Sequence, residues 1–252
     1  MGGPLVMAGV LGTVRGAARL GVFPALTAAC FGDFWLSGAS ASLKARVDWL
    51  RRSSRQHAKW MGLSIRVCGP VPTDGLIVSN HVSYLDILAL SIVTGCGFVS
   101  KKEVRGWPVF GTYAAMGGSI FVDRERRSAV ADVTELMKGH LDQQIPVALF
   151  PEGTSTDGSL VLPFRTSLLE PAVQLGKPVV PCGLRYSVSD GSVADEVAYW
   201  RDMSLATHLP NLLTKTGLHL EMHFGNARTG RDRKALAHDL HADVCKLAGV
   251  SA

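Results

Sequence analysis

Short apolar runs alternate with amphipathic segments from residue 64 onward. The apolar runs predict strands at residues 65–68, 76–79, 97–100, 119–122, 147–150, 179–184 and 218–224. Between them, a three- to four-residue periodicity predicts helices at residues 84–93, 126–141, 167–175, 203–213 and 231–247. Strands that alternate with helices indicate an α/β fold, in which a mostly parallel central sheet is flanked by helices on both faces.

The first forty residues follow another pattern, in which apolar stretches are broken by charges. Residues 1–14 and 20–32 contain no charged side chain, but each stretch is shorter than the ~20 residues that a bilayer-spanning helix needs. We therefore expect this segment to lie in a membrane interface. Two alternatives stay open: a single span over residues 20–43 that tolerates Asp33, and a cleaved signal peptide that ends near residue 30.

Residues 42–61 predict a basic amphipathic helix. Its apolar face is formed by Leu43, Val47, Leu50, Ser54, Ala58 and Met61. Basic side chains occupy much of the rest: Lys44, Arg46, Arg51, Arg52, Arg55 and Lys59. Trp49 and Trp60 lie near the two ends, where an indole suits a membrane interface. The helix therefore docks on a membrane, packs its apolar face on the rest of the protein, or does both.

Composition and charge divide the chain in two. Of its 252 residues, 47% are hydrophobic and 19% charged, which excludes a disordered or fibrous protein. The net charge of +5 is concentrated, because residues 1–60 contain eight basic and two acidic side chains, whereas residues 61–252 contain 18 and 19. This asymmetry indicates an anionic membrane surface at one end of the molecule, and no nucleic acid. We expect an N-terminal membrane-associating helical segment, 1–60, and one domain, 61–252.

Candidate chemistry follows the strand at 76–79, because ligands of open α/β sheets bind beyond the carboxyl ends of strands. His81 lies just after this strand and Asp86 five residues later. On one continuous helix the two side chains would point about 140° apart, so we place His81 in a loop, Ser83 at the helix N-cap and Asp86 in the first turn. There the carboxylate can orient the imidazole, which then takes a proton from a hydroxyl.

The loop after the strand at 147–150 also carries polar groups. Glu152 can accept hydrogen bonds from hydroxyls, and the backbone around Gly153 and Thr154 can approach a polar or anionic ligand. A simple polar turn is the alternative.

Two further strand ends have weaker signals. Arg124 can hold a phosphate or carboxylate, or pair with a neighbouring acid. Pro181 limits the hydrogen bonding of its strand and leaves room for a chain to lie against it. The five cysteines lack the spacing of a zinc site, so we expect no metal.

Taken together and in this order, four segments resemble the sequence blocks of the glycerolipid acyltransferase superfamily, specifically its lysophosphatidic acid acyltransferase-like branch. The four are NHVSYLD (80–86), GSIFVDR (118–124), FPEGTSTDG (150–158) and VPCGLRY (180–186). The resemblance covers about residues 60–225. It implies a glycerol-3-phosphate acyltransferase-like fold for the domain 61–252 and an O-acyltransferase of phospholipid biosynthesis, at the cytoplasmic face of the inner membrane.

The resemblance also implies roles for the residues. His81 is the general base on the acceptor hydroxyl, Asp86 orients it, and Arg124, Glu152, Gly153 and Thr154 bind the acceptor head group. Backbone N–H groups near Gly153 stabilise the oxyanion, and the strand at Pro181 lies near the acyl donor. No cofactor is implied beyond the thioester co-substrate, acyl-CoA or acyl-carrier protein. The implied acceptor is a lysophospholipid, first of all 1-acyl-sn-glycerol-3-phosphate.

The chain departs from the commonest family pattern at Ser155, where an arginine more often follows the threonine. Arg124, Arg165 and Lys101 are candidates to supply the missing cation. An acceptor such as lyso-ornithine lipid therefore stays open, as does a non-catalytic lipid-binding membrane protein. A serine hydrolase is excluded because the chain contains no GxSxG motif.

Overall fold

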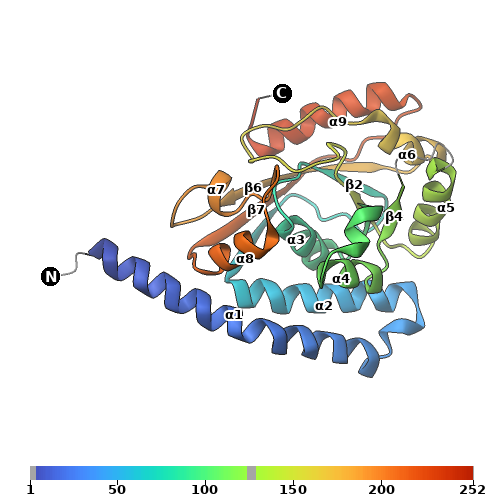
Figure 1. Cartoon of the computed structure of the whole chain (residues 1–252). Coiled ribbons are helices and arrows are strands. Elements are labelled where there is room, and N and C mark those ends of the chain that lie inside the picture. The colour runs from blue at the N-terminus through green and yellow to red at the C-terminus, as the bar shows by residue number, and fades with distance from the viewer. Residues whose placement is uncertain (1–3, 124–128, 252) are drawn as a thin grey trace.

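The computed structural model describes residues 4–123 and 129–251. Within them, one seven-stranded sheet has the order β1-β7-β6-β2-β5-β3-β4 (Figure 1). The strands are β1 (Leu63–Cys68), β2 (Leu76–Ser79), β3 (Gly97–Lys101), β4 (Ile120–Val122), β5 (Val147–Leu149), β6 (Val179–Ser187) and β7 (Leu218–Phe224). Neighbouring strands pair in parallel, except β6 and β7, which are antiparallel. The predicted mostly parallel α/β sheet is confirmed.

Helices cover both faces of the sheet, and a hydrophobic cluster lies under each face (Figure 1). One face carries α2 (Leu43–Met61), α3 (Leu85–Thr94), α4 (Phe110–Met116) and α8 (Leu205–Leu213). The other carries α5 (Ala129–Leu141), α6 (Glu170–Leu175) and α9 (Arg233–Ala248). Short helical segments complete the described chain: η1 (Ala39–Ala41), η2 (Lys102–Gly106), η3 (Thr166–Leu169) and α7 (Val193–Glu196). The sequence pattern did not predict α4 or α7, because both are too short to display a helical period.

The central strands explain the continuous apolar runs of the sequence. Leu76, Ile77 and Val78 of β2 are fully buried, since β5 and β6 pair with β2 on its two sides and helices cover both faces. A strand in this position has no face in water, so alternation with polar residues would bury groups without partners.

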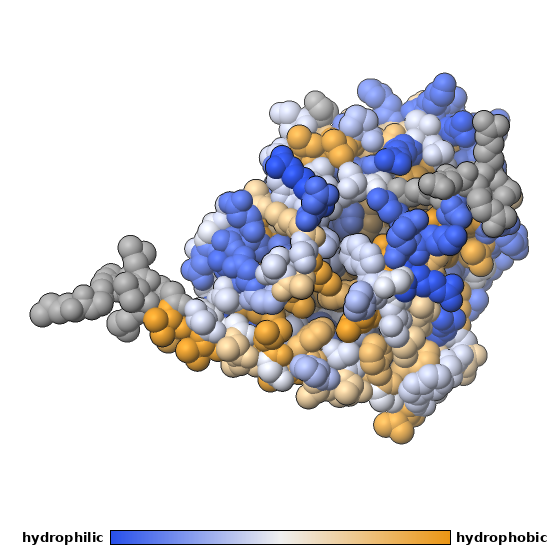
Figure 2. Space-filling view, in the orientation of Figure 1, coloured by the Kyte–Doolittle hydropathy of each residue, from blue (hydrophilic) through white to orange (hydrophobic). Residues whose placement is uncertain are grey.

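The N-terminal helix α1 (Pro4–Leu36) runs unbroken through Pro24 and packs antiparallel to α2 (Figure 1). It leaves large apolar side chains exposed: Val10, Leu11, Val14, Leu20, Val22, Trp35 and Leu36. Apolar surface follows α1 along one edge of the molecule (Figure 2). Within residues 4–123 and 129–251, however, the combination of length and hydropathy that a membrane-crossing helix requires is not met.

Several N-terminal arginines bind carbonyl oxygens at the C-terminal ends of other helices. Arg15 donates to the carbonyl of Thr214 (2.7 Å), just after α8, and Arg19 to that of Leu213 (3.0 Å), the last residue of α8. Arg46 donates to Met116 at the end of α4 (2.8 Å). Arg51 likewise donates to the carbonyl of Ile92 near the end of α3 (2.9 Å). These carbonyls lack intrahelical donors and carry partial negative charge, so much of the N-terminal positive charge serves the fold itself.

The helix α2 is part of the core. Trp49 is completely buried, donates its indole N–H to the carbonyl of Cys30 (2.8 Å) and stacks on Tyr113 at 5.2 Å between ring centroids. Trp60 is partly buried and donates to the carbonyl of Arg19 (2.9 Å). The expectation that an indole meets a membrane interface is therefore wrong for Trp49 and stays a prediction for Trp60. The hydrophobic cluster crosses the boundary expected at residue 60, because α2 supplies apolar side chains to the sheet domain.

Candidate active site

The carboxyl ends of β2 and β5 bring the two candidate loops together. These strands are parallel neighbours, with Val78 opposite Leu149, so the chains that leave them emerge side by side. The amide N–H of Thr156 donates to the carbonyl of His81 at 2.9 Å and ties the loops to each other. The imidazole of His81 also stacks on the ring of Phe150, with centroids 4.1 Å apart. Two distant sequence segments thus form one site.

The carboxylate of Asp86 contacts the imidazole of His81 and the loop backbone next to it. Its Oδ2 atom lies 2.7 Å from Nδ1 of His81 and accepts the backbone N–H groups of Val82 (2.8 Å) and Ser83 (3.0 Å). Asp86 is fully buried, whereas the His81 side chain is 22% exposed. One carboxylate therefore fixes both the histidine ring and the loop that carries it. This geometry leaves Nε2 of His81 as the nitrogen turned away from the acid.

The expected N-cap at Ser83 is wrong. The helix α3 begins at Leu85 after Tyr84, and the buried Oγ of Ser83 has no hydrogen-bond partner among the described residues. Asp86, in the first turn, instead accepts the N–H groups of Val82 and Ser83 in the loop that precedes the helix.

Tyr186 is a site residue that sequence reasoning missed. Its hydroxyl donates to Oδ1 of Asp86 at 2.6 Å, so both carboxylate oxygens have donors. Burial, together with the negative charge of Asp86, raises the pKa of Tyr186 well above its usual value and keeps the hydroxyl protonated. Tyr186 ends the segment VPCGLRY, but only the pairing of β6 with β2 brings that strand beside the loop of Asp86.

Glu152 lies behind His81 instead of in the pocket. It is 3% exposed, and its two oxygens accept the backbone N–H groups of His81 and Leu162, each at 2.7 Å. Burial raises the pKa of Glu152 to about 7, although the two backbone hydrogen bonds oppose the shift. Glu152 is therefore not placed to contact a head group as expected, because both of its carboxylate oxygens already accept backbone N–H groups. Glu152 instead stabilises the loop that carries His81.

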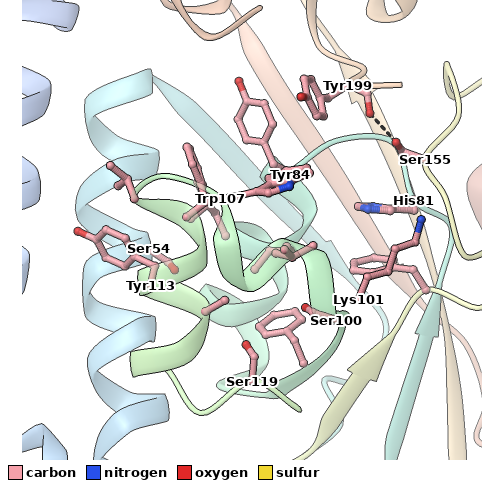
Figure 3. Close-up of a pocket in the computed structure, with 18 of the residues that line it drawn as sticks. Ser54, His81, Tyr84, Ser100, Lys101, Trp107, Tyr113, Ser119, Ser155 and Tyr199 are labelled. Atoms are coloured by element: carbon pink, nitrogen blue, oxygen red, sulfur yellow. Dashed lines mark hydrogen bonds between the residues drawn. The ribbon is translucent and has the colours of Figure 1, made fainter. Parts of the chain in front are cut away.

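An apolar pocket of about 360 Å³ opens beside His81 and extends toward α2 (Figure 3). Its apolar walls come mainly from the helices α1, α2, α3 and α4: Phe23, Leu50, Trp60, Met61, Ile87, Leu88, Phe110, Tyr113 and Ala114. In Figure 3, Ser54 and Tyr113 lie at the end away from His81. Lys101 and Arg201 give the lining its cationic side chains near the loops. The pocket therefore suits a ligand with an apolar chain and an anionic end.

The loop residues expected to bind substrate lie at the pocket, but not all of their polar groups point into it. Gly153 and Thr154 line the pocket, and so does Ser155, which was not among the expected residues. The N–H of Gly153, however, donates to the carbonyl of Phe150 at 3.1 Å within a tight turn, so it does not point at an incoming oxyanion. Ser155 donates its hydroxyl to the carbonyl of Tyr199 at 2.5 Å (Figure 3).

Two other expected site residues do not join this group. Arg124 lies outside the described residues. Pro181 sits within β6 opposite Val78, and the neighbours on its face, Val179 and Gly183, pack toward the α9 side of the sheet. Because strand residues alternate between faces, Pro181 points away from the pocket, and its side chain does not line it. That the strand at Pro181 lies near the acyl donor stays a prediction.

Comparisons with known proteins agree with the sequence blocks. Residues 65–185 match the family model described as Acyltransferase. The chain is 33% identical over 223 residues to a lyso-ornithine lipid O-acyltransferase from Brucella abortus, covering 80% of this chain and 84% of that protein. It is 29% identical over 188 residues to a 1-acyl-sn-glycerol-3-phosphate acyltransferase from Neisseria gonorrhoeae, covering 73% of each.

A solved structure supports the same fold. The crystal structure of the 1-acyl-sn-glycerophosphate acyltransferase from Thermotoga maritima matches with a TM-score of 0.68, over 95% of this chain and 94% of that one, at 20% identity. The fold is thus shared across most of both chains. With the sequence match over 80% of its length, this chain belongs to the acyltransferase family that contains these lysolipid O-acyltransferases.

Proposed function

We propose that this O-acyltransferase moves a fatty acyl chain from a thioester to the hydroxyl of a lysolipid, with His81 as the general base. The observation that carries the proposal is the position of His81: Asp86 holds its Nδ1, and the ring borders an apolar pocket. A general base must reach the reacting hydroxyl, and a fatty chain needs an apolar site next to that base.

The chemistry needs one base and no covalent enzyme intermediate, because a thioester is already activated. Nε2 of His81 takes the proton of the acceptor hydroxyl as its oxygen forms a bond to the acyl carbon. The carbon–sulfur bond then breaks, and the protonated imidazole returns the proton to the departing thiolate. Asp86 stabilises the imidazolium between these two transfers. The donor is acyl-CoA or acyl-carrier protein, and no further cofactor has a role in these steps.

Two acceptors fit the proposal. The first is 1-acyl-sn-glycerol-3-phosphate, as for the Neisseria relative, with phosphatidic acid as product. Lyso-ornithine lipid is the second, because Ser155 stands where an arginine is more usual and donates its hydroxyl to the carbonyl of Tyr199. The Brucella relative carries that acceptor in its name.

We further propose that α1 rests on the membrane that supplies the acceptor. Its exposed apolar residues, Trp35 and Leu36 among them, support insertion into the interface at the cytoplasmic face of the inner membrane. Since Arg15, Arg19, Arg46 and Arg51 bind helix carbonyls, apolar contact supports this docking more than net charge does. Exposed cations such as Arg55 and Lys59 remain to contact anionic lipids.

An acceptor panel tests the function. Purified wild-type protein is supplied with one labelled acyl thioester and, separately, 1-acylglycerol-3-phosphate, lyso-ornithine lipid and other lysophospholipids. We expect a labelled diacyl product from at least one acceptor and none from His81→Ala, with matched folding of both proteins by circular dichroism. Binding of lysolipid without turnover by the wild type would instead identify a non-catalytic lipid-binding protein.

A further inference from the structure

A cation from a segment outside the four sequence blocks lies at the pocket. Arg201 lines the same pocket as His81, Thr154 and Ser155, although it is 46 residues beyond Ser155 in sequence. Lys101, at the end of β3, lines it as well, and Figure 3 shows the Lys101 side chain ending near His81 and Ser155. Two cationic side chains from different elements thus border the space in front of the general base.

The backbone before Arg201 is fixed to the site by hydrogen bonds. Tyr199 donates its N–H to the carbonyl of Val82 (2.9 Å) and accepts the hydroxyl of Ser155 (2.5 Å), so both catalytic loops hold this residue. Trp200 donates its indole N–H to the carbonyl of Ala194 (3.2 Å). The segment is therefore positioned by the same loops that position His81.

Arg201 itself is held in an unusual conformation. Its φ of 54° lies in the left-handed region of backbone conformations. Residues other than glycine, asparagine and aspartate rarely adopt this conformation, because it costs free energy. Its guanidinium lies over the Trp200 ring, 3.7 Å from the centroid. Stacking fixes the plane of a guanidinium and leaves its N–H edge for a planar or tetrahedral oxyanion. The carboxylate of Asp157 near Arg201 already accepts hydrogen bonds from the backbone N–H (2.9 Å) and the hydroxyl (2.6 Å) of Ser159.

We propose that Arg201 binds the anionic group of the acceptor head group and that Ser155 positions it through the carbonyl of Tyr199. Arg201 thereby replaces the arginine that the family pattern more often places at position 155. The shared chemistry is an oxyanion, which is the phosphate of 1-acylglycerol-3-phosphate or the carboxylate of an ornithine head group. The proposal rests on the acyl transfer proposed above and specifies which residue binds the anionic group of the acceptor.

Kinetics of Arg201→Asn test the proposal, because asparagine tolerates a left-handed φ, so the substitution removes the guanidinium without adding backbone strain. We expect the KM for the acceptor to rise about tenfold, as on loss of a charge-assisted hydrogen bond, while kcat and the KM for acyl-CoA change less than about twofold. The matched control is Arg66→Gln, on edge strand β1, whose only described ion pair is with Glu221 at 3.4 Å. Both lysolipids are assayed, so that the phosphate and carboxylate arms are separated.

Ser155→Ala provides the second arm. If Ser155 acts by holding Tyr199 and thus Arg201, its substitution raises the acceptor KM about threefold in the wild type and has little further effect in Arg201→Asn, because coupled residues are not additive. Provided that the wild type is active, an unchanged acceptor KM in Arg201→Asn overturns the proposal. A rise in the KM for acyl-CoA in place of the acceptor KM overturns it as well. Absence of turnover by the wild type on every lysolipid overturns the proposed function itself.

Discussion

Nδ1 of His81 lies 2.7 Å from Oδ2 of Asp86, and the same oxygen also accepts the N–H groups of Val82 and Ser83. One buried carboxylate therefore contacts both the imidazole of His81 and the backbone of the loop that carries it. The residues are five apart and could not meet on a regular helix, so the loop before α3 has to turn back over the first helical turn. That turn brings the two side chains of the HxxxxD motif within hydrogen-bonding distance.

Asp86→Asn should lower kcat by about 100-fold or more, and His81→Ala at least as much, with little change in either KM. The amide cannot accept two backbone N–H groups and orient the imidazole equally well, and alanine removes the base altogether. Steady-state kinetics with acyl-CoA check this. Ser83→Ala is the matched control, because its Oγ has no described partner, and it should retain nearly full activity.

Tyr186→Phe should lower kcat by about tenfold and leave the KM values unchanged. The substitution removes the hydroxyl that donates to Oδ1 of Asp86 at 2.6 Å and leaves a buried carboxylate oxygen without its donor. Such a loss also costs stability, about 1–3 kcal/mol. Kinetics and urea unfolding are measured on the same preparation; wild-type kcat in this variant would show that Tyr186 has no part in positioning the base.

The stability of the protein should depend on pH through Glu152. Burial raises the pKa of this carboxyl from its ordinary value of 4.5 to about 7, so between these values the folded protein keeps a proton that the unfolded chain releases. The free energy of unfolding therefore falls as pH rises from about 4.5 to about 7, by at most ~3 kcal/mol, and is flat above.

Glu152→Gln removes that titration and should flatten this part of the pH profile. Glutamine has one acceptor oxygen for the two N–H groups of His81 and Leu162, so the variant should also be less stable than the wild type at pH 5. Urea unfolding at several pH values between 5 and 8 gives both profiles. Parallel profiles would rule out the titration of Glu152 as their cause.

Ser54→Phe should shift the preference toward shorter acyl chains. Ser54 lines the pocket at the end away from His81, so a phenyl ring there shortens the space for the chain without touching the base (Figure 3). The ratio of kcat/KM for short and long acyl thioesters measures the effect. Ser54→Ala adds no volume and should leave the ratio unchanged; an unchanged ratio in Ser54→Phe would place the chain elsewhere.

The double substitution Trp35→Ser and Leu36→Ser should weaken vesicle binding by about tenfold or more, since it removes two exposed apolar side chains from α1. Co-sedimentation with vesicles of zwitterionic and anionic lipid measures it. Raising the salt concentration should matter less than the substitution, because several N-terminal arginines are committed to carbonyls. Release by salt alone would instead indicate electrostatic docking.

The order of elements could be predicted from the sequence because it depends on local pattern. Each predicted strand, from β1 to β7, is present, since a short apolar run between polar turns has few other ways to bury its side chains. His81 and Asp86 could also be paired from their spacing and the strand before them. These features need only information from neighbouring residues.

What each charged or polar side chain does was decided by tertiary structure. In sequence, the basic N-terminal segment indicates contact with an anionic membrane surface. In the structure, Arg15, Arg19 and Arg46 instead donate hydrogen bonds to carbonyl oxygens at the C-terminal ends of distant helices. Glu152 and Trp49 turned inward for the same reason, because their partners lie far away in sequence. A long side chain can satisfy several partners, and only the fold determines which of them is within reach.

By itself, then, the sequence determined the α/β sheet, the pairing of His81 with Asp86, and the family to which the chain belongs. Only the tertiary structure added Tyr186 to the site, removed Pro181 from the pocket and brought Arg201 to its rim. The physical reason is range: hydrophobic periodicity is a local property of the chain, whereas a hydrogen bond between residues 86 and 186 depends on strand order. That order, with β2 between β6 and β5, is a property of the assembled sheet.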